Sequence, residues 1–380
     1  MRAIWAAAAL CSIAWTAGCA QSGAPLAAAP AQAVPQLRSV MATHFKVGAA
    51  IEPESIDSPA DAALLATQFS SLTAESKMKA GTIGVAEGQY NFEPADKIIA
   101  FAQAHGIAVR GHTLVWHFKN GDWTEAPDWF FDGNPKDPQY HDIVAARLKR
   151  YVTDVVTHFR GKVYAWDVVN EVISDDPHQV YRTDSPWYRA LGKDYIAIAF
   201  RAARAADPDV KLYINEYSTD DAGKRAKLLS VVRDLRAQGV PIDGVGHQMH
   251  ISVNWPPLPN IKQAFDDVAA LGLENQVTEL DVSLYNDPGE CWGNPHACLP
   301  DIGNPVPNDL MRAQALRYRA VFDLFEHEPS IKAVTFWGYS DKHTWLTSTP
   351  AVRTNLPLLF DANLQPKAAL WAIVDPSYQP

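Results

Sequence analysis

The sequence predicts an α/β protein built as a single (β/α)8 TIM barrel over residues 38–380. Short apolar runs rich in β-branched residues alternate with longer helical patterns along this whole stretch. The runs number eight, which is the strand count of such a barrel. No repeat, low-complexity block or linker interrupts them, so no further domain is expected after the barrel.

The eight runs have the composition of strands that are buried on both faces of a parallel sheet. Each is short and mostly apolar, because helices are expected to cover the outside of the barrel and side chains to fill its inside. In chain order the predicted strands are Phe45–Ile51, Phe69–Thr73, Ala108–Thr113, Val163–Val169, Lys211–Ile214, Gly244–Gln248, Gln276–Leu280 and Ala333–Phe336.

Helical patterns lie between these strands. Their apolar residues recur with the helical period, as in Gln139–Phe159, where Ile143, Val144, Leu148 and Val152 lie on one stripe. A glycine follows each of the clearest patterns, a common way to end a helix. The predicted helices are Pro94–Ala104 before Gly106, Gln139–Phe159 before Gly161, Ala222–Gln238 before Gly239 and Ile261–Leu271 before Gly272.

Composition excludes several classes of function. The chain has 380 residues, is 47% hydrophobic and carries a formal net charge of −10. Disorder is therefore excluded for most of the chain, and the lack of basic runs argues against a nucleic-acid partner. Only Trp5 and Trp15 of the twelve tryptophans lie near the N-terminus, so ten remain in the barrel. Some of these ten are expected to present flat faces to a ligand.

Residues 1–37 are predicted to be a signal peptide followed by an Ala/Pro-rich leader. Arg2 is the only charge before Arg38, and the apolar run Ala3–Ala20 follows it. Ala31-Gln32-Ala33 offers a cleavage site, whereas Thr16 to Cys19 is similar to a lipoprotein box with Thr where Leu is usual. We therefore predict an exported bacterial protein, periplasmic or secreted, with lipidation at Cys19 left open. The mature chain is expected to be a monomer without a membrane-spanning segment.

The remaining cysteines agree with an oxidising compartment. Cys291 and Cys298 stand seven positions apart in a Gly/Pro-rich segment and are predicted to form a disulfide bond. A zinc site would need further ligands, and His296 alone does not complete a tetrahedral set. No metal and no other cofactor is predicted.

Polar and aromatic residues follow the carboxyl ends of seven predicted strands, where barrel enzymes hold their active sites. They include two well-separated glutamates among amides, imidazoles and indoles. Phosphate-binding glycine loops, the serine-hydrolase elbow and the zinc-protease motif are missing from the sequence. Two carboxylates among neutral donors and tryptophan rings are typical of a sugar cleft that cleaves a glycosidic bond. The strand-end residues are Glu75, Ser76, Lys79, His112, Trp116, Asn170, Glu171, Asn215, Glu216, Tyr217, Gln248, His250, Glu279, Asp281, Trp337, Asp341 and Trp345.

Five motifs in order make the chain resemble glycoside hydrolase family 10, the endo-β-1,4-xylanases. The likeness covers almost the whole mature chain, from Gly48 to Lys367. The motifs are Gly111-His112-Thr113-Leu114-Val115-Trp116-His117, Trp166-Asp167-Val168-Val169-Asn170-Glu171, Gly246-His247-Gln248-Met249-His250, Val277-Thr278-Glu279-Leu280-Asp281 and Trp337-Gly338-Tyr339-Ser340-Asp341-Lys342-His343-Thr344-Trp345.

The resemblance implies a retaining endo-1,4-β-xylanase that forms a covalent glycosyl-enzyme. Glu171 would be the acid/base and Glu279 the nucleophile, while Asn170 would bind the 2-hydroxyl of the sugar being cleaved. His250 would bridge Glu279 and the supporting Asp281. The resemblance places the other substrate-binding residues on the non-reducing side (Glu75, Ser76, Lys79, His112, Gln248, Trp345), in the walls (Trp116, Trp337) and on the leaving-group side (Tyr217).

Two departures from the family pattern keep alternatives open. Ser76 stands where the family usually has Asn, and Glu216 where it usually has Asp. One alternative is a related retaining β-glycosidase that acts on decorated xylo-oligosaccharides or on a plant saponin glycoside. Another is a sugar-binding protein without catalysis. A metal-dependent barrel hydrolase would have to use His112, His117, His247 and His250.

Overall fold

Eight parallel strands close into a barrel, so the predicted fold is confirmed. The structure is a computed structural model that describes residues 34–120 and 123–380. Neighbouring strands follow the order β1, β2, β5, β8, β9, β10, β12 and β13. Because β13 pairs with β1, the sheet closes into a ring. The barrel strands are β1 (Lys46–Ile51), β2 (Ser71–Ala74), β5 (Ala108–Gly111), β8 (Ala165–Asn170), β9 (Lys211–Glu216), β10 (Gly244–His247), β12 (Glu274–Ser283) and β13 (Ile331–Phe336).

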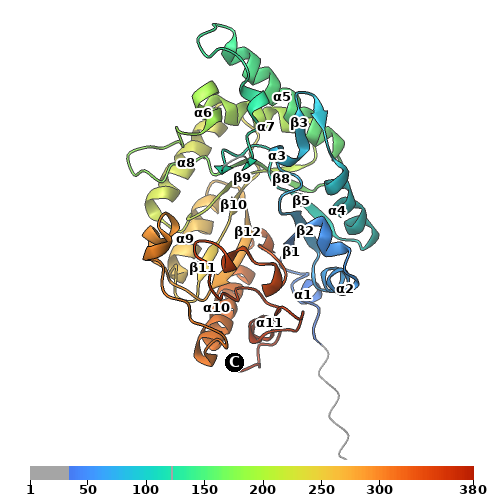
Figure 1. Ribbon diagram of the computed structural model, residues 1–380, viewed down its shortest axis with the longest axis vertical. Helices are drawn as coiled ribbons and strands as arrows, with labels where there is room; N and C mark the ends of the chain where they lie inside the picture. The colour runs from blue at the N-terminus through green and yellow to red at the C-terminus, as the bar shows by residue number, and fades with distance from the viewer. Residues whose placement is uncertain (1–33, 121–122) are drawn as a thin grey trace, which may run out of the picture. The chain divides into compact units, whose positions relative to one another are not determined.

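Helices surround the barrel, as Figure 1 shows. The four predicted helices are present, and the glycines that follow them all have positive φ, between 62° and 72°. Two helices begin at side-chain caps, in which Ser58 accepts from the backbone of Asp61 and Asp221 from that of Lys224. The surrounding helices are α2 (Pro59–Gln68), α4 (Glu93–Ala104), α5 (Tyr140–His158), α7 (Asp194–Ala206), α8 (Ala222–Ala237), α9 (Leu258–Ala269) and α10 (Asn308–Glu326).

Short elements complete the fold around the barrel mouth and ends. They are too short for periodicity to predict. They comprise α1 (Leu37–Val40), α3 (Ala80–Ile83), α6 (Pro186–Leu191), α11 (Ala368–Val374), the hairpins β3 (Gly84–Ala86) with β4 (Gln89–Tyr90) and β6 (Lys119–Asn120) with β7 (Trp123–Thr124), and β11 (His250–Ser252) beside β12.

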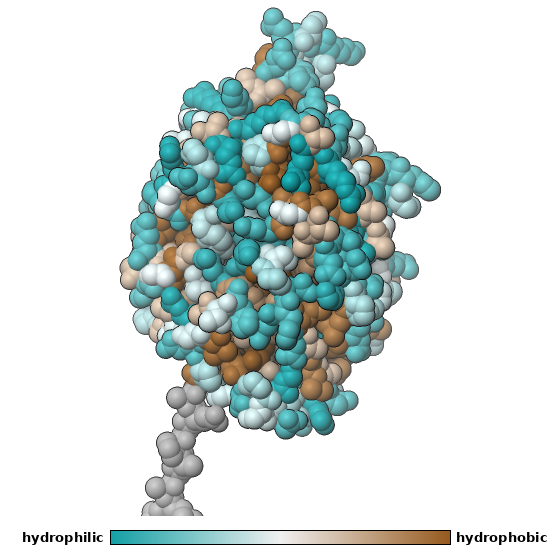
Figure 2. Space-filling view, turned by 180° about the vertical axis from the view of Figure 1, so that it is seen from behind, coloured by the Kyte–Doolittle hydropathy of each residue, from teal (hydrophilic) through white to brown (hydrophobic). Residues whose placement is uncertain are grey.

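The apolar stripe of α5 packs inward except at its first turn. Val144, Leu148, Val152 and Val155 are completely buried. Ile143, predicted on the same stripe, is 39% exposed because it lies at the start of the helix. Figure 2 shows one face of the molecule, on which hydrophilic side chains predominate and apolar ones form small clusters. No helix of the described residues is long and apolar enough to cross a membrane.

A buried ion pair occupies the inside of the barrel below the site. The Arg110 guanidinium binds both carboxylate oxygens of Asp167, and its Nε donates to Gln276 Oε1 at 2.9 Å. Asp167 also contacts His112 Nδ1 at 2.8 Å. A buried charge is tolerated only when it is paired and hydrogen-bonded in this way. The pair therefore connects side chains of β5, β8 and β12. Its Asp167 also holds His112 in place through the contact with Nδ1.

The predictions for the N-terminus fall outside the described residues. The signal peptide, the cleavage site and the lipidation site at Cys19 all lie within residues 1–33. The start of the catalytic domain at residue 38 stays a prediction. In the structure the first helix, α1, begins one residue earlier, at Leu37.

Candidate active site

Glu171 directly follows β8 and receives two hydrogen bonds from neutral donors. Trp116 Nε1 donates to its Oε2 at 2.8 Å, and Gln248 Nε2 donates to its Oε1 at 2.9 Å. Its backbone has φ of 56°, in the left-handed region that a glutamate seldom adopts. The Arg182 guanidinium binds its carbonyl at 3.1 Å, and its N–H donates to the Asn215 carbonyl at 2.9 Å. These contacts fix both ends of the residue at the barrel mouth.

Glu279 lies within β12 and is 5% exposed. Asn215 Nδ2 donates to its Oε1 at 2.8 Å, and His250 Nε2 contacts its Oε2 at 3.2 Å. Burial alone would raise the pKa of Glu279. The His250 hydrogen bond, the electrostatic influence of His112 and the Asn215 hydrogen bond outweigh burial and lower that pKa to about 2. Glu279 is therefore an ionised carboxylate at neutral pH.

His250 bridges two carboxylates, which confirms the predicted contact. Its Nε2 faces Glu279, while its Nδ1 lies 2.9 Å from Asp281 Oδ2. Burial lowers the pKa of His250, but Asp281 and Glu279 raise it to about 10. Trp345 Nε1 donates to the same Asp281 oxygen at 2.9 Å. A single chain of contacts thus runs from Trp345 to Glu279.

Asn215 connects the two glutamates; the sequence predicted it at a strand end of the site but gave it no role. It is completely buried, and besides Glu279 its Nδ2 donates to Asn170 Oδ1 at 2.9 Å. Thr278 Oγ1 donates to Asn215 Oδ1 at 2.8 Å, which fixes the amide orientation. Gly246 leaves room for it, since a Cβ there would lie 2.3 Å from that oxygen. The only sequence signal was its position at a strand end between the two glutamate-bearing strands.

Asn170 has its oxygen occupied from inside the protein. Asn215 donates to Oδ1, and Gln248 Nε2 lies 3.5 Å from the same atom. The Nδ2 group of Asn170 is therefore what this residue can offer to a sugar hydroxyl.

An aromatic wall with one cation lies beside the carboxylates. Lys79 Nζ is 4.7 Å from the Trp116 ring centroid and 5.9 Å from that of Trp337. Trp337 also packs edge-on against His112 at 5.3 Å. Lys79 Nζ makes no ion pair in the described part of the chain, so its donors are left for hydroxyl groups. The structure brings these four predicted residues together.

Glu75 and Ser76 follow β2 and are both partly exposed. Burial and the neighbouring Glu52 raise the pKa of Glu75. Among the described residues, no hydrogen-bond partner is found for the Ser76 hydroxyl, although its carbonyl accepts from the Lys79 backbone at 3.1 Å. The serine therefore has free hydrogen-bonding capacity on the predicted non-reducing side.

Tyr217 is held in a charged cluster. Its hydroxyl donates to Asp175 and accepts from Arg182 Nη2 at 2.7 Å. Lys224 Nζ lies 3.0 Å from its ring centroid and also contacts Asp175 at 2.9 Å. The hydroxyl is thus already bonded, and the uncovered part of the ring is what Tyr217 can present to a leaving group.

Glu216, predicted at a strand end and as a departure from the family pattern, is completely buried. Its carboxylate accepts from the backbone N–H groups of Ile173 and Tyr217, both at 3.0 Å, and contacts Lys224 at 3.2 Å. Burial raises the pKa of Glu216 to about 7, with Lys224 opposing and Glu171 adding to the shift. Through the Ile173 N–H, the Glu216 carboxylate holds the loop that follows Glu171.

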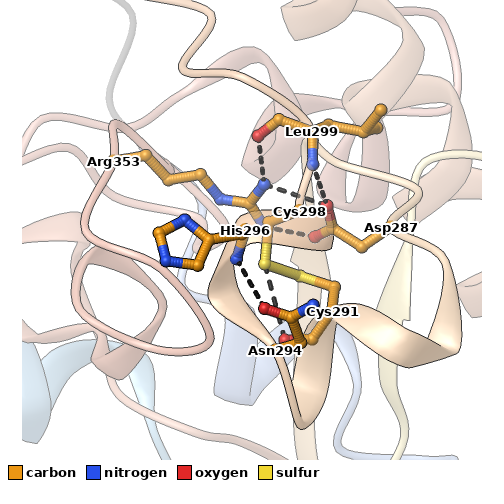
Figure 3. The surroundings of a disulfide bond; sticks show 7 residues. All are labelled: Asp287, Cys291, Asn294, His296, Cys298, Leu299 and Arg353. Atoms are coloured by element: carbon orange, nitrogen blue, oxygen red, sulfur yellow. Dashed lines mark hydrogen bonds and ion pairs between the residues drawn. A yellow bond between two sulfur atoms is a disulfide. The ribbon is translucent and has the colours of Figure 1, made fainter.

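The loop after β12 contains both cysteines of the barrel domain. Their sulfur atoms lie 2.00 Å apart, the separation of a disulfide bond (Figure 3). Asp287 forms an ion pair with Arg353 and accepts from the Leu299 backbone at 2.9 Å. Asp287, Cys291 and Cys298 place possible metal-ligand atoms within 4.8 Å of one another. The two sulfurs are bonded to each other, however, and the carboxylate is paired with Arg353, so these atoms are not available to a metal ion. This cluster therefore closes a loop.

Comparison with known proteins gives a consistent result. Residues 36–376 match the sequence family described as Glycosyl hydrolase family 10. A "Thermostable celloxylanase" from Thermoclostridium stercorarium is 42% identical over 361 residues, covering 91% of this chain and 89% of that protein. "Endo-1,4-beta-xylanase A" from Halalkalibacterium halodurans is 40% identical over 87% of this chain and 84% of that protein. The crystal structure of xylanase B from Clostridium stercorarium F9 superposes with a TM-score of 0.83 at 41% identity, covering 90% of this chain and 100% of that one.

Proposed function

The chain belongs to glycosyl hydrolase family 10, and we propose that it is a retaining endo-1,4-β-xylanase that hydrolyses internal β-1,4-xylosidic bonds of xylan. The alternative of a saponin-directed glycosidase gains no support from the relatives described above. A related enzyme for decorated xylo-oligosaccharides differs from this proposal only in its preference among xylan-derived substrates.

The observation that carries the proposal is the contrast between the surroundings of the two glutamates. Glu279 faces a cationic His250 and is ionised, as a nucleophile must be. Glu171 faces only the neutral donors Trp116 and Gln248 at its carboxylate. Retaining glycosidases need this division between one nucleophilic carboxylate and one acid/base.

The reaction follows from these roles in two steps. Glu171 gives its proton to the glycosidic oxygen while Glu279 attacks the anomeric carbon, so the bond to the leaving sugar breaks as the glycosyl-enzyme bond forms. Water then attacks the same carbon, gives its proton to Glu171 and releases Glu279. Asn170 Nδ2 binds the 2-hydroxyl, a contact that strengthens in the oxocarbenium-like transition state.

The remaining predicted residues receive binding roles in the same proposal. Trp116 and Trp337 form the walls, and Lys79 supplies donors between them. The other residues of the non-reducing side are Glu75, Ser76, His112, Gln248 and Trp345, with Tyr217 on the leaving-group side and Asp281 holding His250.

Substitution of each glutamate tests the assignment. Glu279→Gln should abolish activity on all substrates by at least about a thousandfold, because no covalent intermediate forms. Glu171→Gln should lose far more on xylan than on aryl xylobiosides with good leaving groups, which need no proton. Glu274→Gln, at the start of the same strand as Glu279, is the matched control and should keep full activity. Equal losses of Glu171→Gln on both substrate types would contradict the acid role.

The compartment and the assembly state are also proposals. The N-terminal pattern supports export, with lipidation at Cys19 and free secretion as the two routes. Export to an oxidising compartment would keep Cys291 and Cys298 oxidised. Mass measurement of the mature protein would distinguish the two routes, and light scattering would test the predicted monomer.

A further inference from the structure

A hollow with aromatic side chains in its walls adjoins the active site near Trp345. It has a volume of about 100 Å³ and shares His250 and Asp281 with the site already described. A water occupies ~30 Å³ in the liquid, so the hollow has room for about three waters. A single sugar ring seated at its mouth is the largest part of a substrate that this space can take, and a continuing chain of sugars does not fit.

Two tryptophans of the hollow lie open to solvent. Trp255, between β11 and α9, is 52% exposed, and Trp292, within the disulfide loop, is 54% exposed. Trp292 packs 5.6 Å from Trp345, whose ring in turn lies 4.9 Å from His250. The aromatic surface is therefore continuous from the hollow to the residue that holds the nucleophile.

The walls of the hollow are fixed before any ligand binds. The Ser252 N–H donates to the Trp255 carbonyl at 2.7 Å, and the Trp255 N–H donates to Ser252 Oγ at 3.1 Å. On the other side, the Arg353 guanidinium lies 3.6 Å over the Tyr285 ring. Tyr285 in turn donates its hydroxyl proton to the Thr354 carbonyl at 2.8 Å. Rigid walls reduce the entropy cost of binding a small group.

Charge decides which kind of group fits. The two cations that line the hollow, Arg353 and His250, are each already paired, with Asp287 and with Asp281 respectively. An acidic group would find carboxylates there and no unpaired cation. Asn286, whose Oδ1 lies 3.3 Å from Ser252 Oγ, is exposed and has its amide donors free for a hydroxyl oxygen.

We propose that this hollow is a subsite for a neutral single-sugar branch, such as an arabinosyl group, attached to the xylan chain in the cleft. Trp255 and Trp292 provide stacking faces, and Asn286 provides a hydrogen-bond donor. The proposal rests on the xylanase function and adds a substrate feature to it. An acidic uronosyl branch is excluded from the hollow by the paired charges.

The test compares oligosaccharides that differ only in the branch. The substrates are linear xylopentaose and xylopentaoses with one arabinosyl or one uronosyl branch on each internal xylose in turn. The variants are Trp255→Ala, Trp255→Phe and the control Trp371→Ala, a partly exposed tryptophan of α11. Because Trp255 is half exposed, its truncation leaves the core intact, and a melting curve verifies the fold.

The expected result is specific to the arabinosyl branch. For the best arabinosyl isomer, kcat/KM should fall about five- to thirtyfold in Trp255→Ala, which corresponds to ~1–2 kcal/mol. Trp255→Phe should recover part of it, and the linear and uronosyl substrates should stay within about twofold. Equal losses on linear and branched substrates, or no loss on any arabinosyl isomer, would overturn the proposal. If the unmodified enzyme does not cleave linear xylopentaose, the proposed function itself fails instead.

Discussion

Asn215 offers the sharpest test of the electrostatics around the nucleophile. Its Nδ2 lies 2.8 Å from Glu279 Oε1 and 2.9 Å from Asn170 Oδ1, in a completely buried position. Asn215→Leu keeps the side-chain size but removes both donors. A hydrogen bond to a charged group contributes about 1.5–3 kcal/mol. We therefore expect kcat/KM to fall by roughly ten- to 150-fold at 1.4 kcal/mol per factor of ten.

Asn215→Asp should be more damaging than the leucine variant. It places an acceptor where a donor faced Glu279, so one of the two carboxylates must take up a proton to avoid repulsion. The pKa of Glu279, now about 2, should rise, and the acidic limb of the kcat/KM profile should move to higher pH. An aryl xylobioside with a good leaving group is the substrate of choice, because it reports on the nucleophile alone.

Asn275 provides a matched control. It is another completely buried asparagine, bonded through Nδ2 to the Phe265 carbonyl and to Ser330 Oγ, away from both glutamates. Asn275→Leu should lower the melting temperature without a specific loss of kcat/KM. The reasoning is refuted if Asn215→Leu keeps more than about a third of wild-type kcat/KM, or if Asn275→Leu loses as much.

Three further results are expected. The charged form of His250 stabilises the fold fully below its ordinary pKa of 6.5, and this contribution disappears as pH rises toward 10. Asp281→Asn should lower the pKa of His250, so that the alkaline fall in melting temperature begins at least about one pH unit lower than in the wild type. Ser76→Asn should raise kcat/KM a few-fold on xylotriose and longer substrates, at ~1 kcal/mol for one new hydrogen bond, and a gain on substrates too short to reach it would disprove that placement. Replacing Cys291 and Cys298 by Ser should remove about 2–3 kcal/mol of loop constraint and lower Tm by about 2–5 °C; a reductant should have the same effect on the wild type and none on the variant.

The strands were predictable because each is buried on both faces and reads as a short apolar run. Their carboxyl ends were predictable as a site because parallel strands of a barrel all end at the same mouth. For that reason Glu171, Glu279 and the tryptophans near them lie together as expected. Hairpins whose strands have only two or three residues, such as β6 with β7, carry no periodic signal and were not predicted.

The residues whose roles were not predicted act through contacts that sequence patterns do not report. Asn215 contacts side chains 45 and 64 positions away, and Arg110 contacts Asp167 across 57 positions. Whether an amide turns its oxygen or its nitrogen toward a glutamate depends on further neighbours, such as Thr278 for Asn215. The sequence of a single strand therefore does not reveal it. Tyr217 illustrates the same limit, because its predicted place said nothing of the cluster that occupies its hydroxyl.

The closed loop after β12 is held mainly by bonds of its own. Its cross-link joins Cys291 to Cys298 inside the loop itself, and its ion pair reaches only to Arg353 in another loop. Between these anchors Trp292 packs against Trp345, which bonds Asp281 of the strand that bears Glu279, so exchanges that keep Trp292 leave that strand undisturbed. For protein engineers, the segment from Asp287 to Leu299 is accordingly a natural cassette for grafting between relatives.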